Sequence, residues 1–299
     1  MSNPSADSGR LRAVLGTATP GGGFPLYGDA LVATIHAVDP SLEIVARNTK
    51  GSTENVPLLD AGELDIALVQ GEVASPALAR PDSALRIVAA MYSSPGMFAV
   101  RPDSPCRRIA DLRGKTIALG ARGSGLTILG RSVLAAVGID PDRDIEAIYL
   151  DRAGDGPGMV QDGRVAALWG AGIGWPGFTT LAESAEGARF IVPDAADIPR
   201  ILASNAAIKA LEIPAQAYRG IAAPLRSVGS WSFVLARGDL PEELGWRIAS
   251  ALHRGESAIA ARLAQARETT AANTVAAMPS RQLLHPGVAR YLQEAGLLA

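Results

Sequence analysis

Short apolar runs alternate with helix-like patterns through the first quarter of the chain, and this alternation constrains the fold more than any other sequence feature. The runs at 11–16, 42–47 and 64–70 have the length and composition of buried strands. A second helix is expected from Ser52, as its cap, to Gly62. Strands that alternate with helices in this way predict a parallel sheet with right-handed crossovers. The first helix is indicated by apolar residues at helical spacing, namely Tyr27, Leu31, Ile35 and Val38.

The alternation breaks once and then starts again. Only Ser-Ser-Pro-Gly separates the apolar runs at 85–92 and 97–102, so we expect two successive strands there and a passage into a second lobe. Residues 205–227 are expected to be irregular, and the chain after the strand at 230–239 is expected to be helical. The later strands are predicted at 115–120, 145–150, 165–170 and 189–194.

The chain therefore reads as two α/β lobes. Its 299 residues are about twice the length of a typical domain. We assign residues 1–92 with about 248–299 to the first lobe, and about 93–247 to the second. Ser124 is expected to cap a helix in the second lobe that ends at Gly138.

Composition excludes several classes of function. The formal net charge of −2, with no basic run, argues against nucleic-acid binding. No apolar run approaches the roughly 18 residues of a spanning helix, so we expect no direct membrane insertion. Cys106 is the single cysteine, and His36, His253 and His285 lack close ligand spacing. We therefore expect no cofactor, no metal site and no catalytic residue, although spatial pairing of a histidine with a nucleophile stays open.

The N-terminal residues 1–10 are small and polar and contain no apolar h-region of a signal peptide. Two locations follow from this. The protein is periplasmic if a leader was removed, and cytoplasmic if it is natively leaderless.

Two glycine-rich segments, at 16–23 and 120–125, each follow a predicted strand and precede a predicted helix. Such junctions present backbone N–H groups and the positive end of a helix dipole to an anion. The alternative for each is a plain tight turn. The second segment also carries Arg122, which suits a carboxylate or is simply a solvated side chain. Neither segment is a Walker A loop, a hydrolase elbow or a dinucleotide loop.

A series of motifs in this order resembles the TAXI-type solute receptors, the substrate-binding subunits of some tripartite (TRAP) transporters. The similarity extends from about residue 11 almost to the end of the chain. The motifs are Gly16–Gly22, Thr49–Asn55, Gly62–Ala67 with Val69–Gln70, Ile109–Lys115, Gly123–Gly125, Ile213 to Gly229, Leu284–Gly287 and Tyr291–Leu297.

The resemblance implies a type II periplasmic-binding-protein fold, in which two α/β lobes close by a hinge over a ligand cleft. The implied ligand is a small organic anion, such as an amino acid or dicarboxylate, and the implied partner is a TRAP permease. The residues carried over to the cleft are Thr17, Ala18, Thr19, Gly51, Ser52, Asn55, Gln70, Gly123, Ser124 and Gly125, with Trp169, Gly170, Ala171 and Gly172 as walls. Tyr92 lies at the crossover between the lobes and contacts either the ligand or only the hinge.

The chain departs from the family pattern near the implied cleft. Phe24-Pro25 replaces two aromatic residues, and Lys50 and Arg122 stand where smaller residues are usual. Residues 151–158 replace a more ordinary helical start. Lys50 and Arg122 would raise the positive potential and favour an anion with more than one charge. Lys50 as a solvated side chain is the alternative.

Three functions remain open at this point. The first is a transport-linked receptor for a small organic anion. The second is an enzyme on the same scaffold, such as a decarboxylase or lyase. The third is a cytoplasmic ligand sensor. Reversible binding without turnover favours the first, ligand consumption the second, and a partner other than a permease the third.

Overall fold

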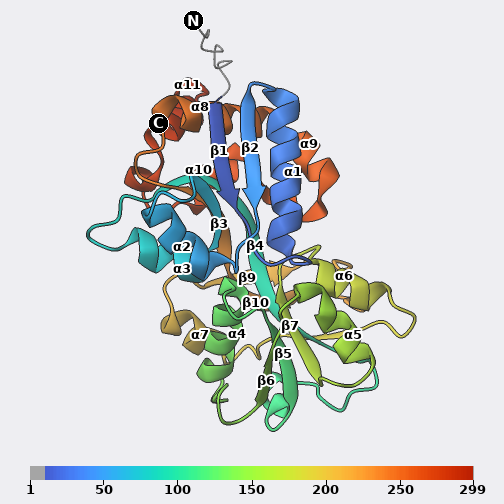
Figure 1. Ribbon diagram of the computed structural model, residues 1–299. Helices are drawn as coiled ribbons and strands as arrows, with labels where there is room; N and C mark the ends of the chain where they lie inside the picture. Colours follow the sequence, from blue (N-terminus) through green and yellow to red (C-terminus); the bar gives the residue numbers. More distant parts are fainter. Residues whose placement is uncertain (1–10, 299) are drawn as a thin grey trace, which may run out of the picture.

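The computed structural model describes residues 11–298 and consists of two α/β lobes joined by two long strands (Figure 1). Residues 1–10, on which the expectation about a signal peptide rests, lie outside the described residues, as does residue 299. The first lobe begins with β1 (Leu11–Gly16), α1 (Gly23–Val38), β2 (Leu42–Arg47), α2 (Ser52–Asp60), β3 (Ile66–Gln70) and α3 (Gly71–Leu78).

The second lobe continues the α/β alternation. Its elements are β5 (Thr116–Gly120), α4 (Gly125–Ala136), β6 (Glu146–Tyr149), α5 (Gly156–Gln161), β7 (Ala167–Ala171), α6 (Pro176–Glu183), β8 (Arg189–Ile191), α7 (Ile198–Ser204) and β9 (Lys209–Ile213), with short 3₁₀ turns η1 (Ile109–Leu112) and η2 (Ala153–Asp155).

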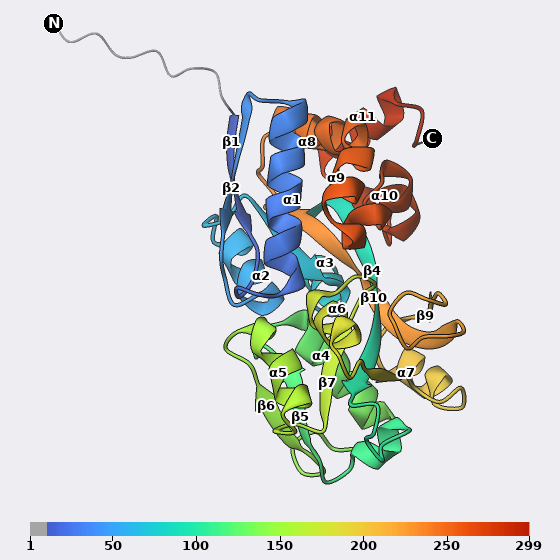
Figure 2. The ribbon, with the colours of Figure 1, turned by 90° about the vertical axis from the view of Figure 1, so that its right-hand side faces the viewer.

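The strands joining the lobes are β4 (Arg86–Val100) and β10 (Leu225–Ala236), and C-terminal helices then cover the first lobe beside α1 (Figure 2). These C-terminal elements are α8 (Glu242–Arg254), α9 (Glu256–Arg262), η3 (Ala264–Glu268), α10 (Ala271–Ala277), η4 (Arg281–Leu283) and α11 (Pro286–Glu294).

The strands lie in the order β2-β1-β3-β10-β4-β7-β5-β6. In each half, three parallel strands are followed by one antiparallel strand: β10 pairs with β3, and β4 pairs with β7. The two halves thus repeat one architecture. Because the parallel strands of each lobe end towards the other lobe, the loops after their carboxyl ends face each other (Figure 1).

The prediction of two strands at 85–92 and 97–102 is wrong. A single 15-residue strand, β4, runs through Pro95. Proline lacks an N–H group for a sheet ladder. It is tolerated here because β4 changes partners at this point: Pro95 lies opposite Gly229 of β10, whereas Gly96 lies opposite Ala171 of β7. The chain does pass between lobes here, without a break in the strand.

Residues 205–227, expected to be irregular, contain β9 and the beginning of β10. These two strands pair with each other from Leu225 opposite Ile213 to Gly229 opposite Lys209. Four of the five β9 side chains are at least partly exposed, which leaves β9 without the apolar pattern of a buried strand. The helix α3, which begins directly after β3, is also absent from the sequence prediction.

Buried side chains form one cluster in the first lobe and two in the second. The first cluster ends along β4 at Tyr92 and resumes along β10 at Phe233. The lobe boundaries at about 92 and 248 stay predictions. If each residue is assigned to the lobe whose buried cluster it joins, the chain re-enters the first lobe near Phe233 rather than near residue 248.

Candidate functional site

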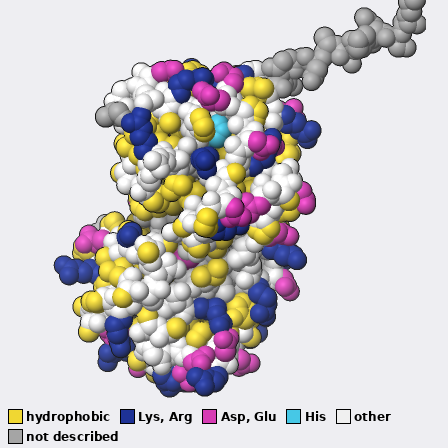
Figure 3. All heavy atoms as spheres, turned by 90° about the vertical axis from the view of Figure 1, so that its left-hand side faces the viewer, with side chains coloured by type: hydrophobic (Ala, Val, Ile, Leu, Met, Phe, Trp, Pro, Cys, Tyr) yellow, Lys and Arg dark blue, Asp and Glu magenta, His cyan; other side chains and the backbone are white. Residues whose placement is uncertain are grey.

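A cavity of about 680 Å³, partly open to solvent, lies between the lobes. Figure 3 shows the waist between the two bodies, where hydrophobic side chains gather on that face. The cavity includes space that is open to solvent within this volume. Its lining comes from both lobes and from the C-terminal segment: Ala18, Thr19, Gly22, Gly23, Phe24, Gly51, Ser52, Gln70, Tyr92, Ser94, Gly120, Ala121, Ser124, Leu126, Leu150, Ala153, Ala171, Trp175 and Gln265.

The first lobe contributes the loops after β1 and β2 and the end of β3. The helix α1 begins at Gly23 with no side-chain cap and no acidic residue in its first turn. No side chain of this helix start therefore offsets the positive end of the helix dipole. Ser52 does not cap α2 as expected. Gly51 is the N-cap instead, with a φ of +108° that glycine adopts readily. The Ser52 hydroxyl accepts a hydrogen bond from the Gln70 N–H at 3.0 Å.

The second lobe contributes a matching strand–loop–helix junction. Ser124 caps α4 as predicted, and its hydroxyl accepts from the Leu126 N–H at 3.1 Å. The chain turns at Gly120, the last residue of β5, which has a φ of +93°. Leu126 and Leu150 add an apolar wall below this junction. The helix start of α4 thus supports a polar ligand while its side chains offer apolar contact.

The lobes touch each other beside the cavity. The Thr53 N–H and hydroxyl both donate to the Gly123 carbonyl, at 3.3 and 2.8 Å. A Cβ at Gly123 would lie 2.8 Å from the Lys50 carbonyl oxygen, and one at Gly21 would lie 3.0 Å from the Gly154 nitrogen. Small residues therefore let the two backbones approach, and the lobes are closed over the cavity.

The structure places some of the predicted site residues on the cavity wall. They are Ala18, Thr19, Gly51, Ser52, Gln70, Tyr92, Ser124 and Ala171. Gly123 and Gly125 lie instead at the contact between lobes, where a Cβ at Gly125 would lie 2.7 Å from the Gln70 Cβ.

Thr17 and Asn55 are buried beneath the first-lobe loops and do not line the cavity. The Asn55 amide donates to the carbonyls of Thr17 and Leu68, both at 2.8 Å, and its oxygen accepts from Thr49 at 2.7 Å. These bonds join the loops after β1 and β2 to strand β3. Asn55 therefore positions the lining without reaching it.

Trp169 and Gly170 also lie behind the lining, in the second-lobe core. The Trp169 indole is fully buried and donates to the Leu126 carbonyl at 2.8 Å. A Cβ at Gly170 would collide with the Trp175 ring at 2.6 Å. Gly172 directly follows β7, and its carbonyl accepts from the Tyr218 hydroxyl at 2.7 Å. These residues shape the wall on which Trp175 sits.

Neither Lys50 nor Arg122 lines the cavity. Lys50 is exposed, and the exposed Arg122 stacks 4.0 Å above the centre of the Tyr149 ring. The Tyr149 hydroxyl in turn accepts from Arg131 at 2.9 Å. These two cationic side chains therefore do not form part of the cavity wall, where they were expected to raise the positive potential.

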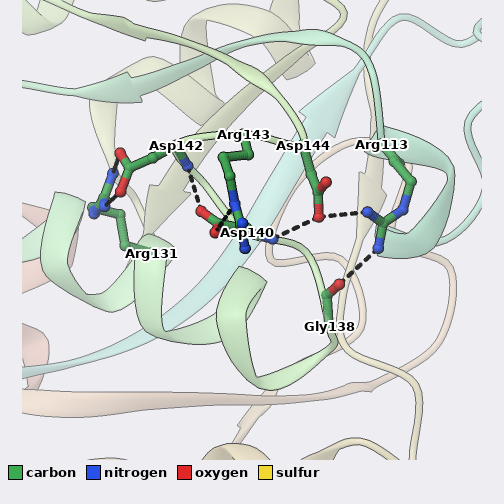
Figure 4. A network of polar contacts seen from close by, with 7 residues as sticks. All are labelled: Arg113, Arg131, Gly138, Asp140, Asp142, Arg143 and Asp144. Atoms are coloured by element: carbon green, nitrogen blue, oxygen red, sulfur yellow. Dashed lines mark hydrogen bonds and ion pairs between the residues drawn. The ribbon is translucent and has the colours of Figure 1, made fainter.

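Arg131 belongs to a polar network that secures the loop between α4 and β6 (Figure 4). It pairs with Asp142 at 2.5 Å, and Asp144 pairs with Arg113. Asp140 accepts from the Asp142 N–H and Asp144 accepts from the Asp140 N–H, both at 2.9 Å. Ion pairs this exposed contribute about 0–1 kcal/mol each, so the network organises a surface loop.

The histidines and the cysteine lie away from the cavity. His36 is exposed; His253 contacts the Tyr291 hydroxyl at 2.9 Å; His285 is buried and contacts the Leu240 carbonyl at 2.9 Å. Burial lowers the pKa of His285. The Cys106 thiol is buried against the Asp111 carbonyl. Over residues 11–298, no group of three or more His, Cys, Asp or Glu side chains is placed to hold a metal ion.

Glu72 is a buried carboxyl behind the cavity, 4% exposed, and sequence reasoning missed it. It lies in the first turn of α3, two residues after Gln70, and accepts from the Ser230 hydroxyl of β10 at 2.8 Å. Burial raises the pKa of Glu72 to about 7, because the charged form loses its hydration. The residue sits where the strand joining the lobes passes the site.

Trp175 and Gln265 line the cavity and were also missed. Trp175 is the N-cap of α6, and Gln265 belongs to η3 in the C-terminal segment. Gln265 is 4% exposed, and its side-chain oxygen has no hydrogen-bond partner. No local pattern marks either residue, since each reaches the cavity through long-range packing.

Residues 15–296 match the NMT1-like family. The chain belongs to that family. The match includes every residue of the cavity lining described above. Within residues 11–298, no helix combines the length and apolar character needed to cross a bilayer.

Solved structures with the same fold include periplasmic binding proteins. MatC from Rhodopseudomonas palustris, solved with bound malate, is 13% identical with a TM-score of 0.60, over 95% of this chain and 96% of MatC. The periplasmic aliphatic sulphonate binding protein SsuA from Escherichia coli is 21% identical with a TM-score of 0.53, over 96% and 84%. A structure described as a periplasmic transporter is 15% identical with a TM-score of 0.58, over 88% of each chain. This NMT1-like chain therefore has the α/β fold of type II periplasmic binding proteins, as its sequence predicts.

Proposed function

We propose that this chain is a solute receptor that binds a small organic anion between its lobes without converting it. The observation that carries the proposal is the cavity itself. Loops from both lobes line it, and helix starts from both lobes border it. A ligand that contacts both lobes stabilises the closed state, so occupancy and closure are coupled.

The chemistry of the wall supports binding over catalysis. Among the described lining residues there is no Asp, Glu, His, Lys, Arg or Cys side chain. Hydroxyls, amides and backbone N–H groups hold a ligand in a defined orientation. A hydroxyl nucleophile needs an adjacent base for activation, and this wall offers none. A decarboxylase or lyase is thus the less supported function.

The motif resemblance to TAXI-type receptors supports a finer assignment, in which the receptor is extracytoplasmic and delivers its ligand to a TRAP-type permease. Two structural neighbours are named for organic anions, a sulphonate and malate, which supports an anionic ligand in this fold. The cytoplasmic ligand sensor differs from this assignment only in its partner.

The test begins with protein that has been unfolded and refolded, which removes any ligand carried through purification. A thermal-shift panel then covers amino acids, dicarboxylates, 2-oxo acids, 2-hydroxy acids, aromatic carboxylates and aliphatic sulphonates. A ligand at 100 times its Kd stabilises the folded state by about 2.7 kcal/mol. We expect a hit that mass spectrometry recovers unchanged after prolonged incubation. Consumption of the hit would establish an enzyme, and no hit in the whole panel would reject the anion receptor.

A further inference from the structure

Gln265 brings an unsatisfied acceptor to the boundary between the lobes. Its side chain is 4% exposed, and Oε1 has no hydrogen-bond partner. The amide lies between two glycines from different lobes. A Cβ at Gly23 would lie 3.2 Å from Oε1, and a Cβ at Gly172 would lie 2.8 Å from Nε2. Because leaving a buried acceptor unpaired is costly, the structure favours a ligand that donates to it.

An anion seat lies directly beside this acceptor. The helix α1 has 16 residues, and neither a side-chain cap nor an acidic residue compensates its N-terminus. Gly22, Gly23 and Phe24 of this first turn all line the cavity. A carboxylate seated there is adjacent to Gln265, since Gly23 is the residue that the amide approaches. A ligand whose carboxylate occupies this helix start therefore brings a substituent close to the carboxylate towards Gln265.

The rest of the wall restricts the charge and the shape of the ligand. The described lining holds no carboxylate to pair with an ammonium group, and burying that charge without a partner is unfavourable. It holds no cationic side chain either, so a second carboxylate would have only the start of α4 and hydroxyl groups to receive it. Trp175, Leu126 and Leu150 present apolar surface instead. A single negative charge with an apolar body fits this wall.

We infer that the ligand is a 2-hydroxy monocarboxylate with an apolar body, and that Gln265 is the residue that selects its hydroxyl group. This inference rests on the proposed function and specifies its ligand class. The hydroxyl donates to Oε1 of Gln265 while the carboxylate occupies the start of α1. A 2-oxo acid has only lone pairs at that position and meets the acceptor with an acceptor. A 2-amino acid brings an ammonium group that no side chain of the wall neutralises.

Two matched sets of acids test the inference on refolded protein by calorimetry and Trp fluorescence. The aliphatic set is 2-hydroxy-4-methylpentanoate, 4-methyl-2-oxopentanoate, leucine and 4-methylpentanoate. The aromatic set is 3-phenyllactate, phenylpyruvate, phenylalanine and 3-phenylpropanoate. In at least one set the hydroxy acid is expected to bind about tenfold or more tightly than its three analogues.

The variant Gln265→Met keeps the side-chain length and removes the acceptor. It is expected to bind the hydroxy acid no better than the unsubstituted acid of the same set. Gln282→Met, at an exposed glutamine in η4, is the matched control and keeps the preference. If circular dichroism shows that Gln265→Met does not fold, Gln265→Asn tests the same point. Its side chain is one methylene shorter, which moves the acceptor oxygen away from the ligand.

The outcomes separate this inference from the proposed function. Tighter binding of an oxo acid, an amino acid or a dicarboxylate overturns the 2-hydroxy assignment and leaves the receptor standing. An undiminished hydroxyl preference in Gln265→Met overturns the role of Gln265. Failure of every compound in both sets and in the wider panel rejects the receptor, and this inference with it.

Discussion

The Thr53 hydroxyl of the first lobe donates to the Gly123 carbonyl of the second at 2.8 Å. The bond joins the two lobes beside the cavity, and only closed lobes can form it. Thr53 is exposed, so water competes for the same carbonyl. The bond therefore contributes modestly to closure and not at all to the packing of either lobe.

Thr53→Val is expected to raise the Kd of the tightest-binding acid about two- to tenfold, because the closed state loses one exposed hydrogen bond. The melting temperature of the ligand-free protein should change little. Thr180→Val, at an exposed threonine on α6, is the matched control. An unchanged Kd would show that this contact does not contribute to closure.

Gly123→Ala is expected to raise the Kd of the tightest-binding acid by about tenfold or more. Its Cβ would lie 2.8 Å from the Lys50 carbonyl oxygen, so closure would require backbone to move. Gly158→Ala, where a Cβ meets nothing within 4 Å, is the control. Scattering measurements should show that Gly123→Ala stays more extended with ligand than the wild type does. Equal compaction of both proteins would contradict this account.

Asn55→Ala is expected to lower the free energy of unfolding by roughly 3 kcal/mol, because buried carbonyls of Thr17 and Leu68 lose their donor. Urea denaturation measures the loss. Asn48→Ala, at an exposed residue of the same loop, should cost much less. A loss of ligand affinity with unchanged stability would instead place Asn55 in contact with the ligand.

Glu72→Gln is expected to change how stability depends on pH. Burial raises the pKa of Glu72 from 4.5 to about 7, so the folded state holds a proton that the unfolded chain has released. The contribution of this group to stability is present below pH 4.5 and is lost as the pH rises towards 7. The free energy of unfolding contributed by Glu72 falls by about 3 kcal/mol between these pH limits.

Urea unfolding at pH 5 and pH 8 measures this effect as the difference between wild type and Glu72→Gln. The variant should gain on the wild type as the pH rises. The control Glu63→Gln, at an exposed glutamate, shows how much of the pH dependence comes from removing any carboxylate. A constant difference at both pH values would mean that Glu72 is not the titrating group.

Local signals were sufficient to predict the alternation of strands and helices at the start of each lobe and the junctions that border the cavity, but not α3, β9 or the unbroken β4. The helix start at Ser124 is one example, because an N-cap is defined by a few adjacent residues. The strand ends at Gln70 and Gly120 are others, since apolar runs mark where buried strands stop. The α/β fold follows from this alternation.

Tertiary structure decided which residues face the ligand. Asn55 belongs to a predicted binding motif, yet its amide bonds to two loops and to strand β3 beneath the cavity. Gln265 belongs to no motif, yet the packing of the C-terminal segment brings it between Gly23 and Gly172. Local periodicity records burial and helix ends, because these depend on near neighbours. Which buried polar group is left without a partner depends on contacts between segments far apart in the sequence, and only the folded chain brings those segments together.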